Sequence, residues 1–377
     1  MRGDVSTERS RPTQADVART AGVSQATVSM ALNAGPEAMG RLTEETRQRI
    51  LAAVEETGYW GNLAAKQLAG GRTSVLGVFT YEPVFPHAAS DFYYPFLQGI
   101  EAEALGHDVD LLLFTSSHNS RSGAGGEGLR DWARRGRLHL ADGCILFGRH
   151  SQRRDLAELL AHDYPFVFVG RREADGAEVP YVGADYEQAT VEIVEHLADL
   201  GHQRIALALE FPEHESGVDR RRGFDRAIQE TGAVPLILDG TVEHTGALLD
   251  DMLGTGTTAI AATPDIAATL RLDALRRGLS IPADLSIARL GDPEKPDGST
   301  VGWSGFSIPR HEMGTGAVQM LLRHLQSPAR PGETQVLLRC EVRASSTTGP
   351  APGSKASAAA RSRHPRSVLG TTQENTR

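Results

Sequence analysis

Apolar positions change their spacing along the chain, and the change divides the sequence into three parts. Small and apolar side chains in "DVARTAGVSQATVSMALN", residues 16–33, recur at helical spacing on both sides of Gly22. From residue 73 to residue 348, apolar β-rich runs such as "SVLGVFT" alternate with helical stretches. Residues 349–377 contain few apolar side chains. We therefore predict an N-terminal helical unit, an α/β body and a disordered tail.

The N-terminal stretch has the layout of a helix-turn-helix, whose second helix enters the major groove of DNA. Gly22 permits a positive φ at the end of the first helix, and Ser24 can cap a second helix over 25–32. Ala18 is small where the two helices would cross. A plain helical hairpin inside a core is the alternative. The hydroxyl-rich "SQATVS" instead favours an outer face that includes Gln25, Ala26, Ser29 and Met30.

The following stretch, "LTEETRQRILAAVEETGYW", predicts a third helix that braces the first two. Thr43 can cap this helix, and Glu44 and Glu45 lie near the positive end of its dipole. The predicted headpiece therefore spans residues 11–60. The small residues and paired glycines of "GNLAAKQLAGGRTS" indicate a hinge over residues 61–72, before the apolar pattern changes.

The alternation of strands and helices in residues 73–348 predicts parallel sheets that are covered by helices on both faces. Several helical stretches end at a glycine, as helices commonly do. The segment is too long for one small sheet. Ligands of such sheets bind beyond the carboxyl ends of the strands, so a binding site is expected there.

Composition and charge agree with a globular protein whose body is acidic. The chain is 40% hydrophobic and 23% charged, and its formal net charge is −9. Residues 11–72 carry seven Lys and Arg against six Asp and Glu, and residues 349–377 carry five against one. Cys144 and Cys340 form no CxxC pair, and the sequence shows no signal peptide and no apolar run of membrane-spanning length. We expect a soluble cytoplasmic protein without a membrane partner.

Three motifs that suggest other chemistry do not fit their context. "GAGGEG", residues 123–128, satisfies G-x-G-x-x-G but does not directly follow its strand, so we expect a surface loop rather than a dinucleotide site. His196 and His202 lack metal-ligand spacing and are expected to be a solvated residue and a turn residue. Ser304 in "GWSGF" lacks the second glycine of a nucleophile elbow, because Phe306 lies there. We expect no cofactor, no metal site, no catalytic residue and no enzymatic activity.

Motifs in a fixed order resemble those of the lactose/galactose repressor (LacI/GalR) family of transcriptional regulators. They extend over residues 12–348 and include the helix-turn-helix stretch, "AAKQLAGGRTSVLGV", "DGCILFG", "RRRGFDRAI", "ALRRGLSIPADLSI" and "HEMGTGAVQMLL". The resemblance implies an effector-binding and dimerisation core, residues 73–348, with two periplasmic-binding-protein-like lobes and a ligand cleft. It also implies a homodimeric repressor that binds operator DNA and responds to a small-molecule effector such as a sugar.

The resemblance extends to the residues of the DNA interface. Gln25 can pair with an adenine edge, and Met30 can contact a thymine methyl where the family often has a basic residue. Leu68 and Ala69 match the pair that wedges into the minor groove. Asn62 also matches, although a glycine replaces the family's preceding proline. The expected DNA-binding residues are Ser24, Gln25, Ala26, Thr27, Ser29, Met30, Asn33, Asn62, Leu68 and Ala69.

The expected effector-binding residues follow from the same resemblance. Arg220 corresponds to the arginine that reaches the ligand, and an exposed arginine at the start of a helix is the alternative. Phe92 and Tyr93 lie where the first core helix begins beside the cleft, although core packing would also explain them. Asp292 is the remaining member of an aspartate pair, because Gly291 replaces the first.

Two classes of function remain open from the sequence. Thr263 and Pro264 lie where Asn-Asp is common in the family, so the identity of the ligand is not determined. The leading hypothesis is a DNA-binding repressor that a small molecule controls. The alternative is a small-molecule sensor that acts as an activator or through protein contacts. The polar outer face of residues 25–33 favours the repressor, because a protein-binding helix would expose an apolar stripe.

Overall fold

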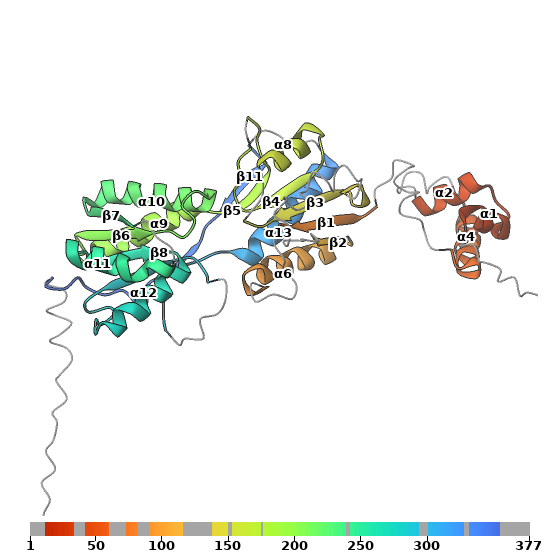
Figure 1. Ribbon diagram of the computed structural model, residues 1–377. Coiled ribbons are helices and arrows are strands. Elements are labelled where there is room, and N and C mark those ends of the chain that lie inside the picture. The colour runs from red at the N-terminus through yellow and green to blue at the C-terminus, as the bar shows by residue number, and fades with distance from the viewer. Residues whose placement is uncertain are drawn as a thin grey trace, which may run out of the picture. The chain divides into compact units, whose positions relative to one another are not determined.

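The computed structural model describes residues 12–33, 42–59, 73–81, 90–115, 138–149, 153–174, 176–238, 242–293, 301–327 and 332–354. These residues belong to a small N-terminal unit and to a large unit that begins at Leu76 (Figure 1). Several predicted features lie outside the described residues, namely the hinge with Asn62, Leu68 and Ala69, the "GAGGEG" segment and residues 355–377.

The described part of the N-terminal unit contains helices α1 (Gln14–Ala21), α2 (Gln25–Asn33) and α4 (Glu44–Thr57). Thr13 and Asp16 form a capping box at the start of α1, in which each side chain accepts a hydrogen bond from the other's main-chain N–H. Gly22 ends α1 with a φ of 66°. The Ser24 hydroxyl accepts a hydrogen bond from the Thr27 N–H at 3.1 Å, so the predicted cap of α2 is confirmed.

A small apolar core joins the three helices. Val17 of α1, Val28 of α2 and Ile50 of α4 are fully buried, and Tyr59 packs beside them. Val28 is the only buried residue of α2 among those whose side chains are described. The side of α2 opposite Val28 is therefore not packed in this core. The predicted helix-turn-helix with a bracing third helix is therefore confirmed.

The first lobe of the large unit is built on a six-stranded sheet in the order β11-β5-β4-β3-β1-β2. In β3, Ile145 and Phe147 face a core shared with two helices, while Cys144 and Leu146 face the core of a third helix on the other side. Helices thus cover both faces, as predicted (Figure 1). The elements are β1 (Val75–Thr80), α6 (Ser90–Gly106), β2 (Asp110–Thr115), η1 (Leu138–Leu140), β3 (Gly143–Phe147), α8 (Arg153–Ala161), β4 (Phe166–Val169), β5 (Tyr181–Ala184), α13 (Arg310–Gln326) and β11 (Gln335–Leu338).

The second lobe repeats this plan with the strand order β12-β10-β9-β8-β6-β7. Neighbouring strands are parallel except β10 and β12, which pair antiparallel. Every residue of β8 is buried, because helices cover both faces of the sheet. The elements are α9 (Tyr186–Asp199), β6 (Arg204–Ala208), α10 (Glu215–Thr231), β7 (Val234–Leu238), η2 (Val242–His244), α11 (Thr245–Thr255), β8 (Ala259–Ala262), α12 (Pro264–Arg276), β9 (Ser286–Leu290), β10 (Ser304–Ser307) and β12 (Glu341–Arg343).

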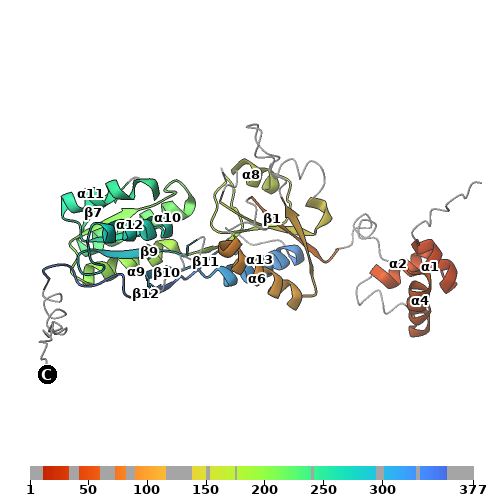
Figure 2. The same ribbon diagram turned by 60° about the horizontal axis from the view of Figure 1, so that its bottom comes forward.

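The chain passes between the two lobes at three places in the described residues. It leaves the first lobe from β5 to α9, returns from β10 to α13, and leaves again from β11 to β12. Figure 2 shows these connections in a second view, with α13 in the first lobe and α9 in the second. Each sheet therefore receives a strand from the C-terminal part of the chain.

Each lobe contains two helices whose backbones approach closely through glycine. In the first lobe, a Cβ atom on Gly314 of α13 would lie 2.2 Å from the Phe96 carbonyl oxygen of α6. In the second lobe, a Cβ atom on Gly223 of α10 would lie 2.2 Å from the Glu187 carbonyl oxygen of α9. Any larger side chain at either glycine would force the helices apart.

The second lobe extends further along the chain than predicted. The Ala351 N–H donates to the Leu200 carbonyl at 2.9 Å, and the Gly349 N–H donates to the Ser286 hydroxyl at 3.0 Å. The predicted start of a disordered tail at residue 349 is therefore wrong, because residues through Ser354 contact the lobe. Low apolar content indicated disorder, but these residues are bound through their main chain.

The two histidines of this lobe are also less exposed than predicted. His202 is 2% exposed, and its Nε2 lies 3.0 Å from the Gly349 carbonyl oxygen, while Nδ1 lies 2.8 Å from the Thr258 hydroxyl. His196 is half-buried, with Nε2 3.0 Å from the Thr348 hydroxyl. Both side chains therefore bind the C-terminal segment or its neighbours rather than lying in solvent or in a simple turn.

Candidate effector cleft and DNA-binding helix

Helix α2 presents an uncharged polar surface. Gln25 and Ala26 are exposed, whereas Ser29 and Met30 are half-buried. The Ser24 and Thr27 hydroxyls lie 2.8 Å apart at the start of the helix. The structure thus places Ser24, Gln25 and Ala26 on the surface as predicted, and it buries Ser29 and Met30 more than predicted.

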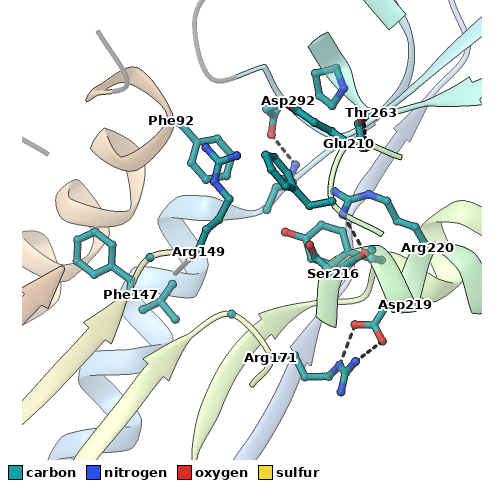
Figure 3. Close-up of a pocket in the computed structure, with 18 of the residues that line it drawn as sticks. Phe92, Phe147, Arg149, Arg171, Glu210, Ser216, Asp219, Arg220, Thr263 and Asp292 are labelled. Atoms are coloured by element: carbon teal, nitrogen blue, oxygen red, sulfur yellow. Dashed lines mark hydrogen bonds and ion pairs between the residues drawn. The ribbon is translucent and has the colours of Figure 1, made fainter. Parts of the chain in front are cut away.

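The predicted cleft lies between the two lobes of the large unit and encloses a cavity of about 150 Å³ (Figure 3). The loops that follow β3, β4, β6 and β9 line it, together with the first turns of α6, α10 and α12. The cavity is therefore at the carboxyl ends of parallel strands, where the strand pattern predicted it.

Arg220 extends from α10 into the wall of this cavity (Figure 3). The side chain is buried, and two of its nitrogens donate to main-chain carbonyls, Nε to Leu290 at 3.1 Å and Nη1 to Ser216 at 2.9 Å. Its Cζ lies 4.1 Å from the centre of the Tyr186 ring. Burial lowers the pKa of Arg220 below its ordinary value. The alternative of an exposed arginine at a helix start is therefore wrong, while its contact with a ligand stays a prediction.

The other predicted effector residues line the same cavity. Phe92 and Tyr93 are in edge contact with ring centres 5.3 Å apart, and both also pack in the core of the first lobe. Asp292 lies opposite them, where its carboxylate accepts a hydrogen bond from the Ile308 N–H at 2.8 Å and lies 3.6 Å from Arg310. The aromatic residues thus serve the core and the cleft together.

Sequence reasoning missed an ion pair that joins the lobes beside the cavity. Arg171, after β4 of the first lobe, donates from Nε and Nη2 to the two carboxylate oxygens of Asp219 in α10, both at 2.8 Å. Burial lowers the pKa of Arg171, but the hydrogen bonds that it donates to Asp219 and Glu173 outweigh burial and raise the pKa above its ordinary value. The run "GRRE" after an apolar strand was the available signal, because strand ends line such clefts.

Arg149 of the first lobe and Glu210 of the second, which sequence reasoning also missed, face each other across the cavity. Arg149, after β3, lies with its Cζ 5.1 Å from the Phe211 ring of the second lobe. Glu210 is half-buried next to Phe211, and its pKa is raised by burial and by the nearby Asp265, although Arg149 opposes this shift. The cleft therefore offers cations, carboxylates and aromatic faces, which are the groups that bind hydroxylated or charged small molecules.

Among the described residues, no group of three or more His, Cys, Asp and Glu side chains has the arrangement of a metal site. The helices of the described ranges include none with the length and apolar character to span a membrane.

Comparisons with known proteins cover both units. Residues 13–62 match the family described as bacterial regulatory proteins, lacI family, and residues 194–347 match the periplasmic binding protein-like domain. The HTH-type transcriptional regulator AglR of Rhizobium meliloti (strain 1021) is 31% identical over 358 residues, which cover 89% of this chain and 94% of that protein. Catabolite control protein A of Priestia megaterium is 28% identical over 336 residues, which cover 82% and 91%.

Solved structures share the fold. The Lac repressor dimer bound to operator and the anti-inducer ONPF has a TM-score of 0.66 at 23% identity, and the match covers 90% of this chain and 100% of that one. The complex of the transcriptional regulator CelR with cellobiose has a TM-score of 0.58 at 21% identity, with coverage of 89% and 100%. A regulator from Enterococcus faecium with bound ribose has a TM-score of 0.56 at 21% identity, with coverage of 73% and 99%.

Proposed function

Because the chain belongs to the LacI family of bacterial regulatory proteins and is a DNA-binding transcriptional regulator, we propose that it is a homodimeric repressor controlled by a small-molecule effector. The observation that carries this proposal is the pairing of an outward polar helix, α2, with a lined cavity between the two lobes. We place its action in the cytoplasm, where the DNA lies, and assign it binding functions without catalysis.

The DNA contacts are proposed for α2 and the segment that follows α4. The exposed amide of Gln25 suits an adenine edge, and the Met30 side chain suits a thymine methyl. The hydroxyls suit phosphates. The proposed contact residues are Ser24, Gln25, Ala26, Thr27, Ser29, Met30 and Asn33 in the major groove, with Asn62, Leu68 and Ala69 in the minor groove.

A dimer is required because one small head makes too few base contacts for high specificity. Two heads related by two-fold symmetry double the contacts at half-sites with fixed spacing. The solved Lac repressor with a similar fold is a dimer bound to operator. We propose the same assembly and a pseudo-palindromic operator for this chain.

The effector is proposed to bind the cavity between the lobes, in contact with Arg220, Phe92, Tyr93 and Asp292. Relatives of similar fold bind cellobiose and ribose, which supports a sugar or a related polar metabolite. Binding there would close the lobes and shift the DNA-binding equilibrium by the difference in effector affinity between the two states.

Selection of bound sequences from random DNA tests the regulator function directly. The full-length protein should enrich one pseudo-palindromic sequence, and Gln25→Ala should change the preferred base at one position of each half-site. A lost base contact is worth about 1–3 kcal/mol. Glu55→Ala, an exposed change on α4, is the matched control and should return the wild-type sequence.

Two results would contradict the proposal. One is the absence of any enriched sequence for the wild-type protein. The other is a monomer at micromolar concentration by sedimentation, both with and without the enriched DNA. An unchanged preference in Gln25→Ala would remove only the assignment of that contact.

A further inference from the structure

Three arginines around the cavity are balanced by carboxylates within the protein. Arg171 pairs with both carboxylate oxygens of Asp219. Arg172 lies 3.7 Å from the Glu215 carboxylate, and Arg310 lies 3.6 Å from that of Asp292. Each of these three guanidinium groups therefore has a carboxylate partner that comes from the second lobe.

Arg220 differs from these three arginines. No carboxylate of the described residues lies within 4.0 Å of its guanidinium, and its polar partners are the main-chain carbonyls of Leu290 and Ser216. Asp219 precedes it in the sequence but directs its carboxylate to Arg171 (Figure 3). The faces of the Tyr186 and Phe306 rings lie against the guanidinium of Arg220, and the Asp219 carboxylate acts on its charge only from beyond ion-pair distance.

A buried cation without an anion is costly, and this cost falls when an anion binds next to it. Burial of an ionised group in a medium of low polarity is unfavourable unless the charge is paired. The carbonyls and the Tyr186 face offset part of this cost. A guanidinium also binds carboxylate and phosphate oxygens with two parallel hydrogen bonds, which few other side chains can do.

The position of Gly291 leaves space beside this guanidinium. A Cβ atom there would lie 3.2 Å from Nη2 of Arg220, and the φ of +124° also favours glycine. No side chain from this position competes with a ligand for Nη2. The cavity of about 150 Å³ is close in size to one that accommodates a single six-membered ring, so the ligand has to be compact.

We propose that the effector is a compact hydroxylated acid whose carboxylate or phosphate oxygens accept hydrogen bonds from Arg220. Its hydroxyl groups would donate to Glu210 and Asp265, which line the same cavity. This proposal rests on the assignment of the cavity as the effector site, and it narrows the chemical class from sugars in general to their acidic derivatives.

The test compares acidic and neutral sugars on the full-length protein. Thermal unfolding midpoints are measured with D-glucose, D-glucuronate and D-glucose 6-phosphate, and with the corresponding galactose compounds, at one ionic strength set with NaCl. We expect at least one acid to raise the midpoint in a saturable way while its neutral parent does not. The uronates test whether the protein binds a carboxylate, and the sugar phosphates test whether it binds a phosphate.

Variants locate the binding group. Arg220→Gln should weaken binding of the acid by about 10- to 100-fold, the range for a lost hydrogen bond to a charged group. Arg220→Lys, which keeps the charge but loses the paired geometry, should fall between wild type and Arg220→Gln. Arg221→Gln is the matched control, because Arg221 is the next residue of the same helix and pairs on the surface with Asp225. Circular dichroism verifies the fold of each variant, and Arg220→Lys keeps the test decisive where Arg220→Gln does not fold.

Three results would overturn the proposal. They are equal stabilisation by a neutral sugar and its acid, stabilisation by no acid of the panel at 10 mM, an order of magnitude above typical metabolite affinities, or unchanged acid binding in the Arg220 variants. Operator selection is measured separately on the wild-type protein. A failed acid test with a successful selection therefore refutes the ligand class and leaves the regulator function standing.

Discussion

The two lobes share one strand order but present opposite charges to the cleft. Beyond its strands the first lobe carries basic side chains, Arg149, Arg171 and Arg172. The second lobe carries acidic ones, Glu210, Asp219, Asp265 and Asp292. The sheets are constrained by packing on both faces, whereas residues after the strand ends are free to differ. Lobes of one architecture can therefore attract each other across the cleft.

Arg220 is an exception to this difference between the lobes, because it is a basic side chain of the second lobe. Arg171, Arg172 and Arg310 reach across the cleft to carboxylates. Arg220 instead remains within its own lobe, between Leu290, Ser216 and Tyr186. The comparison indicates two roles for arginine in one cleft. The arginines paired with carboxylates connect the lobes, whereas Arg220 is the one that we propose binds the ligand.

Of the changes predicted here, removal of the Asp219 carboxylate should lower the free energy of unfolding the most. Asp219→Ala leaves the half-buried Arg171 with Glu173 as its one remaining carboxylate partner, so we expect a loss of about 3 kcal/mol in the free energy of unfolding. Urea denaturation followed by circular dichroism measures this loss. Asp225→Ala removes an exposed pair on the same helix and should cost about 0–1 kcal/mol. Equal losses in the two variants would show that the ion pair between lobes is not a special contact.

A smaller loss in the free energy of unfolding is expected when alanine replaces a glycine at which two helices meet. This loss should be similar in both lobes. Gly314→Ala and Gly223→Ala each place a methyl group against a main-chain carbonyl, with an expected cost of about 1–3 kcal/mol. Gly254→Ala in α11 meets no atom within 4 Å and should be neutral or slightly stabilising. Thermal unfolding compares the three variants. If Gly314→Ala lowered the unfolding midpoint and Gly223→Ala did not, the two lobes would differ in how well they tolerate helix separation.

The smallest effect is expected from the pH dependence of the second lobe. Burial lowers the pKa of His202, so the folded protein keeps it neutral while the unfolded chain protonates it below pH about 6.5. The unfolded state then binds more protons, and stability decreases as the pH falls from 6.5 towards the lower folded pKa.

The variant His202→Gln isolates this contribution. We expect its unfolding midpoint to change less between pH 7.5 and pH 5.5 than that of the wild-type protein. The flattening should be partial, because burial also lowers the pKa of His196, which the variant retains. Parallel pH profiles for the two proteins would show that His202 is not the group responsible.

Features with a local cause were predictable from the sequence. The caps of α2 and α4 depend on Ser24 and Thr43, which lie next to the helices they cap. The strands appear as apolar runs because both faces of each sheet are covered, and the cleft follows from the ends of those strands. The place of Arg220 beside the cleft was also predictable, but only through resemblance to a family.

Features that join distant parts of the chain were not predictable. Asp219 lies 48 residues from Arg171, and Gly349 lies 147 residues from His202. Neither pairing leaves a periodic pattern, because it depends on where two loops arrive in space. The error at residue 349 has this origin, since its segment is ordered by hydrogen bonds from elsewhere in the lobe.

The sequence by itself determined the helix-turn-helix, the alternation of strands and helices and the family, because each depends on neighbours within a few residues or on motifs in order. Only the tertiary structure decided which charges are paired. Folding brings the carboxylates of the second lobe to Arg171, Arg172 and Arg310, and brings main-chain carbonyls to Arg220. The physical reason is that a charge acts over a few ångströms in space, and sequence separation does not measure that distance.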